Sequence, residues 1–92
     1  MPKFLRTKTL NMWKITIKEN RQDMATFETT PRYDIFLNGE FFDQAYYNMT
    51  GYRVGLPTPD GAVLDPGEIS ITKLKREIAS LNREARAKTE HG

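Results

Sequence analysis

The segment from Ile71 to Lys88 constrains the fold of this chain more than any other. Its apolar residues recur at spacings of three and four, and a helical rotation of about 100° per residue gathers them on one side. They are Ile71, Leu74, Ile78, Leu81 and Ala85. A helix with one apolar stripe must bury that stripe against another element. We therefore expect a C-terminal helix that covers one face of whatever the preceding residues form.

The opposite side of this helix is mostly basic. Helical spacing places four residues opposite the stripe: Lys73, Arg76, Ser80 and Arg83. Two cations lie on one flank, Lys75 and Arg86, and two acids lie on the other, Glu77 and Glu84. Glu84 and Lys88 are spaced for a favourable i, i+4 pair. A solvated charged face is ordinary for a surface helix, but a basic stripe over residues 73–83 would also cover about 15 Å and neutralise a few phosphates.

Two β-type runs precede a central proline. Met12 to Lys18 alternates apolar and polar residues, which predicts a half-buried strand with Trp13 in the core. The polar run ENRQD then predicts a turn. Met24 to Thr30 (MATFETT) resumes β-type composition, with Ala25, Phe27 and Thr29 on one face. We expect these two runs to pair as a hairpin that ends at Pro31.

A second hairpin is the strongest local signal. Tyr33 to Leu37 and Glu40 to Tyr47 flank Asn38-Gly39, the dipeptide that most readily adopts a type I′ turn. A short helix over Phe41 to Met49 is the alternative, but the apolar spacing there is not helical, so a strand is favoured. Alternation should send about half of the rings inward: Phe41, Phe42, Tyr46, Tyr47 and Tyr52. The outward rings, with Met49, either cover the sheet edge or form a protein-binding patch.

These elements predict an α+β fold, in which a small antiparallel sheet of about four strands carries one C-terminal amphipathic helix on one face. Residues 1–92 form one domain, since the chain is too short for two cores. Residues 1–11 are either a flexible arm or an edge strand. Residues 55–67 are rich in proline and glycine and predict a loop. Ser70 is the expected helix N-cap, Asp65 caps a separate turn, and residues 89–92 should fray.

Composition excludes several classes of protein. There is no cysteine, so disulfides, zinc fingers and thiol catalysis are absent together. Apolar runs are short, and the N-terminal stretch MPKFLRTKTL lacks the apolar core of a signal peptide. We expect a soluble, cytoplasmic protein with no membrane association.

The chain offers little catalytic chemistry. Its one histidine, His91, lies next to the C-terminus, where a metal or a reacting group would be poorly held. Asp34 and Asp43 could face each other across the hairpin, but nothing adjacent in the sequence favours acid–base chemistry there. No phosphate-binding glycine motif is present. We therefore expect no enzyme activity, no metal, no cofactor and no small-molecule substrate.

Charge is distributed unevenly along the chain. Residues 1–18 carry five basic residues and no acid, residues 19–68 carry a net charge of −6, and residues 69–88 carry +4. Basic ends around an acidic middle suit a partner that displays both signs, as a ribonucleoprotein does. Chance variation among small domains accounts for the same pattern equally well.

Antiparallel hairpins followed by the basic helix EISITKLKREIASLNREARAK, in a chain of 92 residues without cysteine or catalytic motif, resemble the small phage-encoded anti-CRISPR proteins. In size and overall sequence the chain is similar to inhibitors of type I-F surveillance complexes. The resemblance covers the whole chain but has no diagnostic motif, so it assigns no residue a role. It implies a non-catalytic inhibitor in the cytoplasm of an infected bacterium. Such a protein would bind the backbone subunits of the crRNA-guided complex and prevent target DNA from pairing with the guide.

The candidate partner-binding residues are of both signs: Lys73, Lys75, Arg76, Arg83 and Arg86 on the helix, and Asp34, Glu40 and Asp43 on the hairpin. The acids would compete for the lysines and arginines of a nucleic-acid channel, and the helix would touch crRNA phosphates or acidic protein. One alternative is an accessory protein that grips DNA or RNA through both basic ends. Another is a small phage structural protein that oligomerises through its aromatic face.

Overall fold

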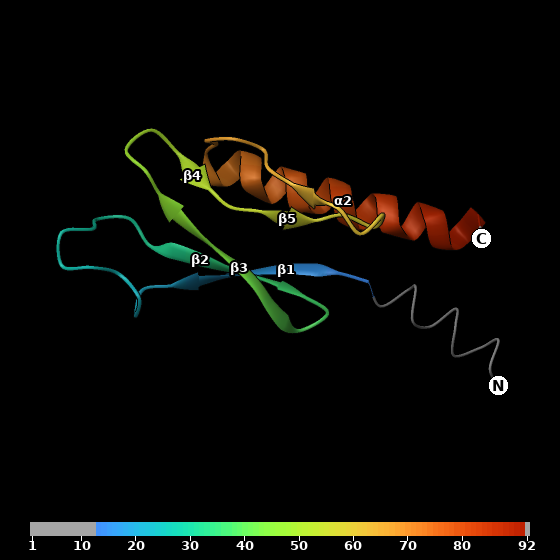
Figure 1. The fold of residues 1–92 in the computed structure, drawn as a ribbon, viewed down its shortest axis with the longest axis horizontal. Coiled ribbons are helices and arrows are strands. Elements are labelled where there is room, and N and C mark those ends of the chain that lie inside the picture. Colours follow the sequence, from blue (N-terminus) through green and yellow to red (C-terminus); the bar gives the residue numbers. More distant parts are fainter. Residues whose placement is uncertain (1–12, 92) are drawn as a thin grey trace.

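The computed structural model describes residues 13–91, with side chains through Lys88, and shows an antiparallel sheet with one helix along it (Figure 1). The sheet has the order β1-β2-β3-β4. Its strands are β1 (Ile15–Asn20), β2 (Arg32–Leu37), β3 (Glu40–Tyr47) and β4 (Tyr52–Arg53). A separate two-stranded sheet pairs β5 (Leu56–Pro57) with β6 (Val63–Leu64), and α2 (Ile71–His91) follows. The predicted α+β class, with four strands and one C-terminal helix, is confirmed.

The turn between β2 and β3 is the one that Asn38-Gly39 predicts. Asn38 and Gly39 both adopt positive φ, at 53° and 85°, as a type I′ turn requires. Asn38 also anchors the start of β1: its N–H donates to Lys14 O at 2.9 Å, and its Oδ1 accepts from Lys14 N–H at 2.9 Å. This turn therefore joins β2 to β3 and also holds the start of β1 beside them. The helical alternative for Phe41 to Met49 is wrong, because residues 40–47 are strand β3.

A bulge in β3 shifts the register of this hairpin. Ile35 pairs with Asp43 whereas Phe36 pairs with Phe41, so Phe42 is an extra residue in β3. Asp34 pairs with Gln44, one position from Asp43. Since successive strand residues point to opposite faces, the two carboxylates lie on opposite sides of the sheet. The expectation that Asp34 and Asp43 face each other is wrong.

The predicted strand from Met24 to Thr30 is also wrong. β1 pairs with β2 instead, with Ile17 opposite Ile35. Residues 21–31 form turns in which side chains satisfy backbone N–H groups: Asn20 Oδ1 accepts from Gln22 and Asp23, and Glu28 Oε1 accepts from Ala25. These local bonds compete with a strand ladder. Phe27 is consequently not part of a strand, and its side chain is 86% exposed.

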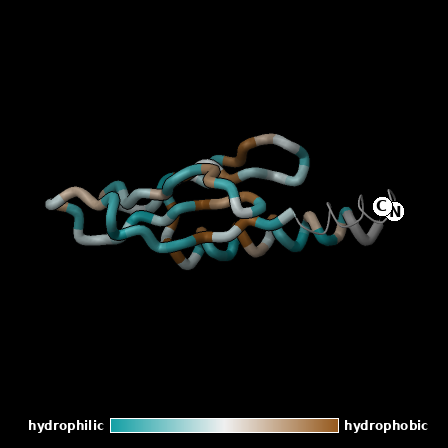
Figure 2. Tube along the Cα trace, turned by 90° about the horizontal axis from the view of Figure 1, so that it is seen from below, coloured by the Kyte–Doolittle hydropathy of each residue, from teal (hydrophilic) through white to brown (hydrophobic). Residues whose placement is uncertain are grey.

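The core lies between the inner face of the sheet and α2. Four of the five stripe residues of α2, all except the half-buried Ile71, are buried against residues from every main-sheet strand and from β5. The strand and connecting residues of this core are Ile15, Ile35, Ala45, Tyr52, Val54, Leu56 and Ile69. Trp13 packs against it half-buried. Figure 2 shows apolar and polar residues interleaved along the strands and α2, as expected for elements with one buried face.

The helix begins as predicted and ends later. Lys73 N–H donates to Ser70 Oγ at 3.1 Å, so Ser70 is the N-cap, and Gly67 N–H donates to Asp65 Oδ1 at 2.9 Å in a separate turn. α2 then continues past the expected end at Lys88 to His91, because no glycine or proline interrupts it before Gly92. The short pair β5 and β6 lies inside the segment predicted as a loop. Residues 1–11, predicted as an arm or edge strand, lie outside the described residues.

The segment entering α2 is joined directly to β4. Tyr52 N–H donates to Ile69 O at 2.7 Å, and Ile69 N–H donates to Tyr52 O at 3.0 Å. The buried Gly51 lies against the same backbone. Sheet and helix are thus linked by main-chain bonds on the β4 side. In the described range, α2 lacks the uninterrupted apolar sequence that a helix crossing a membrane requires.

Candidate functional site

The cations on the outside of α2 have no internal partner within residues 13–88. Lys73, Lys75, Arg76, Arg83 and Arg86 are all exposed, and we refer to these five residues as the cationic face. The ion pairs formed by described residues all lie elsewhere: Arg21 with Glu19, Arg32 with Glu28, Arg53 with Asp65, and Lys88 with Asp60. Among the described side chains, no carboxylate neutralises the cationic face.

Burial and two hydrogen bonds fix which way this face points. Leu74, Ile78 and Leu81 are buried against the sheet, which sets the rotation of α2 about its axis. Asn82 then sets its position along β1, since Ile15 N–H donates to Asn82 Oδ1 at 2.8 Å and Asn82 Nδ2 donates to Ile15 O at 3.1 Å. Sequence reasoning missed Asn82. A polar residue directly beside the apolar stripe is the signal that could have indicated it.

Lys88 is not part of the cationic face. Its ammonium group pairs with Asp60 in the turn between β5 and β6, which joins the end of α2 to that hairpin. The predicted i, i+4 pair of Lys88 with Glu84 is not the one the structure forms. A tertiary partner has replaced the local one.

The acidic candidates are not brought together, and two of them support the fold. Asp34 accepts hydrogen bonds from Asn20 Nδ2 at 2.8 Å and from Gln44 Nε2 at 2.9 Å. Asp43, on the other face, accepts from Gly55 N–H at 2.9 Å and holds β5 beside β3. Glu40 is exposed beside the β2–β3 turn. Only Glu40 of the three presents a carboxylate without a described hydrogen-bond partner.

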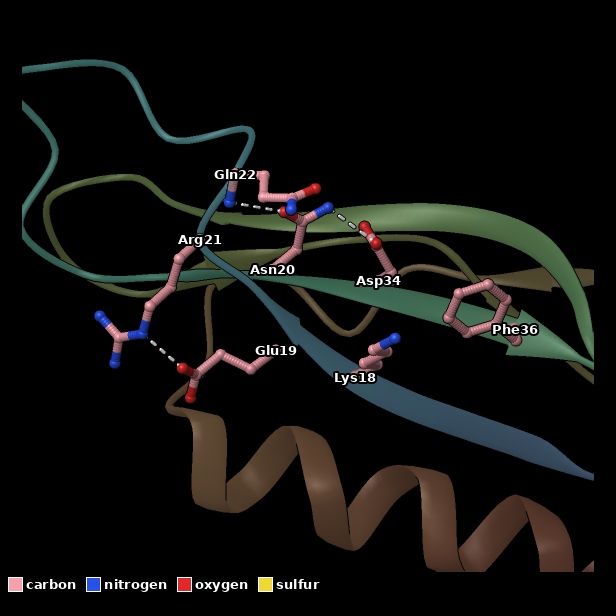
Figure 3. A pocket seen from close by; sticks show the side chains of 7 residues that line it. All are labelled: Lys18, Glu19, Asn20, Arg21, Gln22, Asp34 and Phe36. Carbon is pink, nitrogen blue, oxygen red and sulfur yellow. Dashed lines mark hydrogen bonds and ion pairs between the residues drawn. The ribbon is translucent and has the colours of Figure 1, made fainter.

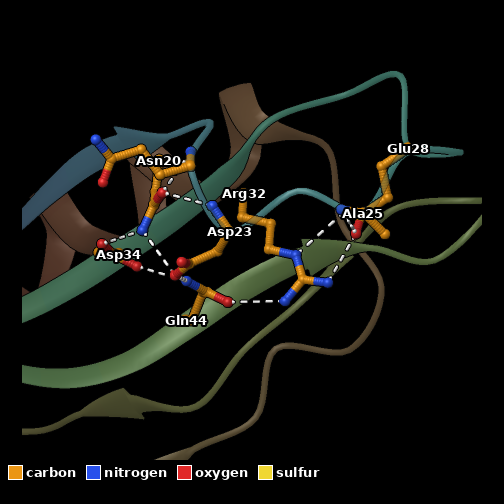
Figure 4. Close-up of polar contacts among 8 residues, drawn as sticks. Asn20, Asp23, Ala25, Glu28, Arg32, Asp34 and Gln44 are labelled. Atoms are coloured by element: carbon orange, nitrogen blue, oxygen red, sulfur yellow. Dashed lines mark hydrogen bonds and ion pairs between the residues drawn. The ribbon is translucent and has the colours of Figure 1, made fainter.

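A polar network on the outer face of the sheet holds residues 21–31 in place (Figure 4). Gln44 bridges it, donating to Asp23 and Asp34 and accepting from Arg32. The guanidinium of Arg32 also donates twice to Glu28, at 2.7 and 3.2 Å. Hydrogen bonds from Arg32 and from Ala25 N–H lower the pKa of the Glu28 carboxyl, and the bond to Glu28 raises the pKa of Arg32. These side chains are occupied with one another.

The hollow beside β1 and β2 has no catalytic arrangement (Figure 3). Its lining residues are Lys18, Glu19, Asn20, Arg21, Gln22, Asp34 and Phe36. Arg21 pairs with Glu19 at 2.5 Å and Asn20 donates to Asp34, so three of its charged groups are already neutralised or hydrogen-bonded. Within the range that the structure describes, no three metal-ligating side chains come together.

Some of the aromatic residues pack against the core and others are exposed, and Tyr46 and Tyr47 are exposed although they are neighbours in β3. Tyr52 is buried, donates its hydroxyl to Pro31 O at 2.7 Å, and has its pKa raised by burial. Phe42 packs against the core. The exposed ones are Phe41, Tyr46 and Tyr47, together with Met49. Tyr47 and Met49 line a shallow groove with Phe27 at the end of the sheet.

The fold and its surface define a small α+β protein in which one helix both closes the core and presents cations that form no ion pair with any described residue. No family model, curated protein or solved structure matches the chain.

Proposed function

We propose that this protein is a non-catalytic binding protein that docks the cationic face of α2 on a phosphate-rich macromolecular surface. The observation that carries the proposal is that five cations on one helix have no ion-pair partner in the described part of the chain. Unpaired like charges on one rigid element repel one another and gain most by meeting an anionic partner.

The length of the cationic face suits a short stretch of nucleic acid. From Lys73 to Arg86 the helix advances about 20 Å at about 1.5 Å per residue. This length corresponds to roughly six base steps at about 3.4 Å along one strand of a duplex. The face would therefore reach a few phosphates, which gives moderate, salt-sensitive binding and no sequence readout.

The resemblance to anti-CRISPR proteins gives the proposal its particular form. As an inhibitor of a type I-F surveillance complex, the protein would lay the cationic face on crRNA phosphates or on acidic protein of the complex. It would thereby prevent target DNA from pairing with the guide. The acidic half of this hypothesis depends on Glu40, because Asp34 and Asp43 use their oxygens in internal hydrogen bonds.

Co-elution with an assembled type I-F complex at physiological salt tests this form. The double variant Arg76→Glu/Arg83→Glu should fold normally, since neither side chain is buried, and should lose co-elution. Lys14→Glu/Lys18→Glu makes the same change in net charge on the sheet and should retain it. Failure of the unmodified protein to co-elute, or equal loss in both double variants, contradicts the inhibitor proposal.

Direct binding to free nucleic acid is the second candidate, and the internal engagement of Asp34 and Asp43 favours it over a mixed-charge surface. It predicts a gel shift on naked duplex or single strand. The affinity should fall with salt at a slope of about −0.9 per duplex phosphate contacted. Binding only to the assembled complex would instead support the inhibitor. A stable oligomer in light scattering, with neither partner bound, would point to the structural phage protein.

A further inference from the structure

The outer edge of β1 presents backbone groups with no partner among the residues described. In an antiparallel ladder, successive residues turn their N–H and C=O groups alternately toward one neighbour and the other. Lys14 turns both groups toward Asn38, whereas Ile15 turns both toward Asn82 on α2. Ile17 and Glu19 therefore also turn their backbone groups away from β2.

This edge is the open one of the described sheet. The opposite edge, β4, is closed by the two hydrogen bonds between Tyr52 and Ile69. On β1, Asn82 fills the position at Ile15 as a strand would. Two N–H and two C=O groups remain, on Ile17 and Glu19.

Burial decreases along β1 away from Asn82. Ile15, next to Asn82, is 1% exposed, whereas Ile17 is only half-buried. Ala79 lies one helical turn before Asn82 on the same flank and is exposed with a small side chain. A further strand could therefore lie beside Ile17 and Glu19 without displacing the helix.

The charges around the edge select an acidic strand. Lys14 and Lys18 are exposed on the outer side of β1, and Lys75 lies on the Asn82 flank of α2. Glu19 is neutralised by Arg21 at 2.5 Å. The open edge is thus bordered by three lysines and one carboxylate that is already paired.

The same charges disfavour a second copy of this chain. A two-fold axis at Lys18 would place the two Lys18 side chains directly opposite each other, and an axis at Glu19 would do the same with two carboxylates. An axis at Ile17 would pair Glu19 with Ile15, whose backbone groups Asn82 already occupies.

We propose that the β1 edge binds an extended acidic segment of another protein, which adds to the sheet as an antiparallel strand. The segment forms backbone hydrogen bonds with Ile17 and Glu19, and its residue opposite Lys18 is Asp or Glu. Backbone bonds provide the affinity in this mode, and alternate side chains provide the specificity. The site shares only Lys75 with the cationic face, and it goes beyond the function proposed above.

A short peptide of alternating glutamate and threonine is the probe, and a peptide of alternating lysine and threonine is its control. In an amide NMR titration of the full chain, the acidic peptide should shift the Ile17 and Glu19 amides and slow their hydrogen exchange. Equal binding of the lysine peptide, or shifts confined to α2, would overturn the proposal.

Glu19→Pro removes an outward N–H without removing a ladder bond, since proline is tolerated on an edge strand in this orientation. It should weaken acidic-peptide binding about tenfold, the effect of about 1.4 kcal/mol. Glu19→Gln keeps the N–H and should bind at least as well as the unmodified protein. Lys18→Glu, which leaves the backbone unchanged, should weaken binding about fivefold. Unchanged affinity in both Glu19→Pro and Lys18→Glu would exclude strand addition.

Amide exchange and the oligomeric state of the protein without peptide show whether the β1 edge is already occupied by the chain itself or by a second copy. If the Ile17 and Glu19 amides are already protected in the monomer, the chain's own residues 1–12 cover the edge, and the proposal is wrong. A dimer that Glu19→Pro abolishes would show that a second copy binds there, which also overturns it. Exchange of these amides at the rate of open strand residues, in a monomer, is the result expected.

Discussion

Asn82 fixes the position of α2 along β1. Its amide bonds to both backbone groups of Ile15, at 2.8 and 3.1 Å, across most of the length of the sequence. Ile15 is buried, so water cannot easily replace the amide. The side chain therefore does for β1 what a neighbouring strand would do.

Replacing this amide should be costly. Asn82→Ala leaves a buried N–H and a buried C=O without partners, and we expect it to lower the free energy of unfolding by about 2 kcal/mol. Urea denaturation measures this. Ser80→Ala, on the exposed side of α2, is the matched control and should change stability by less than about 0.5 kcal/mol. Equal effects of the two substitutions would mean that the bonds to Ile15 contribute nothing.

Glu28 should make stability depend on pH. Its folded pKa is lowered, chiefly by the hydrogen bond from Arg32, from an ordinary value of 4.5. Its contribution is therefore fully present above about pH 4.5 and is lost as the pH falls through the lowered folded value. Glu28→Gln should be less stable than the unmodified protein near neutral pH, and the difference should shrink in acid. Urea midpoints at about pH 7 and pH 3 check this.

Glu40→Gln is the control for that experiment, because Glu40 is exposed and its carboxylate has no hydrogen bond with any described residue. The difference in stability between Glu40→Gln and the unmodified protein should be the same at neutral pH and in acid. A Glu28→Gln difference that stays constant from neutral pH to acid would show that the ion pair with Arg32 does not stabilise the fold.

Single residues show where sequence reasoning succeeded and where it could not. The exposure of Arg76 and Arg83 follows from helical periodicity alone, because a stripe that must be buried fixes the opposite side. The roles of Asp34 and Asp43 could not be predicted, because the β3 bulge at Phe42 decides which face each carboxylate joins. Bulge positions depend on tertiary packing and leave no local pattern.

At the scale of elements, the structure of residues 33–47 was predictable from the sequence and that of residues 24–30 was not. The hairpin at Asn38-Gly39 was predictable because its turn requires two positive φ values, which few dipeptides adopt as readily. The stretch MATFETT has the composition of a strand, but Glu28 bonds to Ala25 N–H and to Arg32 instead. Amino-acid composition indicates whether a segment favours a strand, but it does not show whether side chains will hydrogen-bond the backbone in place of a neighbouring strand.

The junction of β4 with the segment entering α2 depends on a glycine. A Cβ at the buried Gly51 would lie 2.9 Å from Ile69 N and 3.1 Å from Ile69 O. Backbone atoms held by the bonds to Tyr52 cannot easily move aside. Gly51→Ala should therefore separate β4 from Ile69 and lower the free energy of unfolding by about 2 kcal/mol, as overpacking typically does.

Gly55→Ala is the matched control. Its Cβ would meet Val63 Cγ1 at 3.1 Å, but that side chain is exposed and can rotate away. In thermal unfolding, the Tm of Gly55→Ala should therefore be well above that of Gly51→Ala. The reverse order would show that close approach of β4 to Ile69 is not what Gly51 provides.

At the scale of the whole molecule, α2 borders two surfaces that share only Lys75. Its apolar stripe closes the core, its far side carries the cationic residues Arg76 and Arg83, and its Asn82 flank borders the open edge of β1. Polar bonds among residues 20–44 occupy much of the outer face of the sheet, which leaves it less available to a partner. The fold thus offers one surface suited to phosphates and one suited to an extended acidic strand.

Because Arg76 and Arg83 do not border the β1 edge and Glu19 is not part of the cationic face, a change at either place should not alter binding at the other surface. Arg76→Glu/Arg83→Glu should weaken binding to a phosphate-rich partner at least about tenfold and change the affinity for the glutamate–threonine peptide by less than about twofold. Glu19→Pro should show the reverse pattern. The combined variant should bind both partners more weakly. For each partner, titrated alone, the change in binding free energy should equal the sum of the changes measured in the two parent variants. Loss of both activities in either parent variant would mean that one surface binds both ligands, since a fold intact by circular dichroism excludes unfolding as the cause.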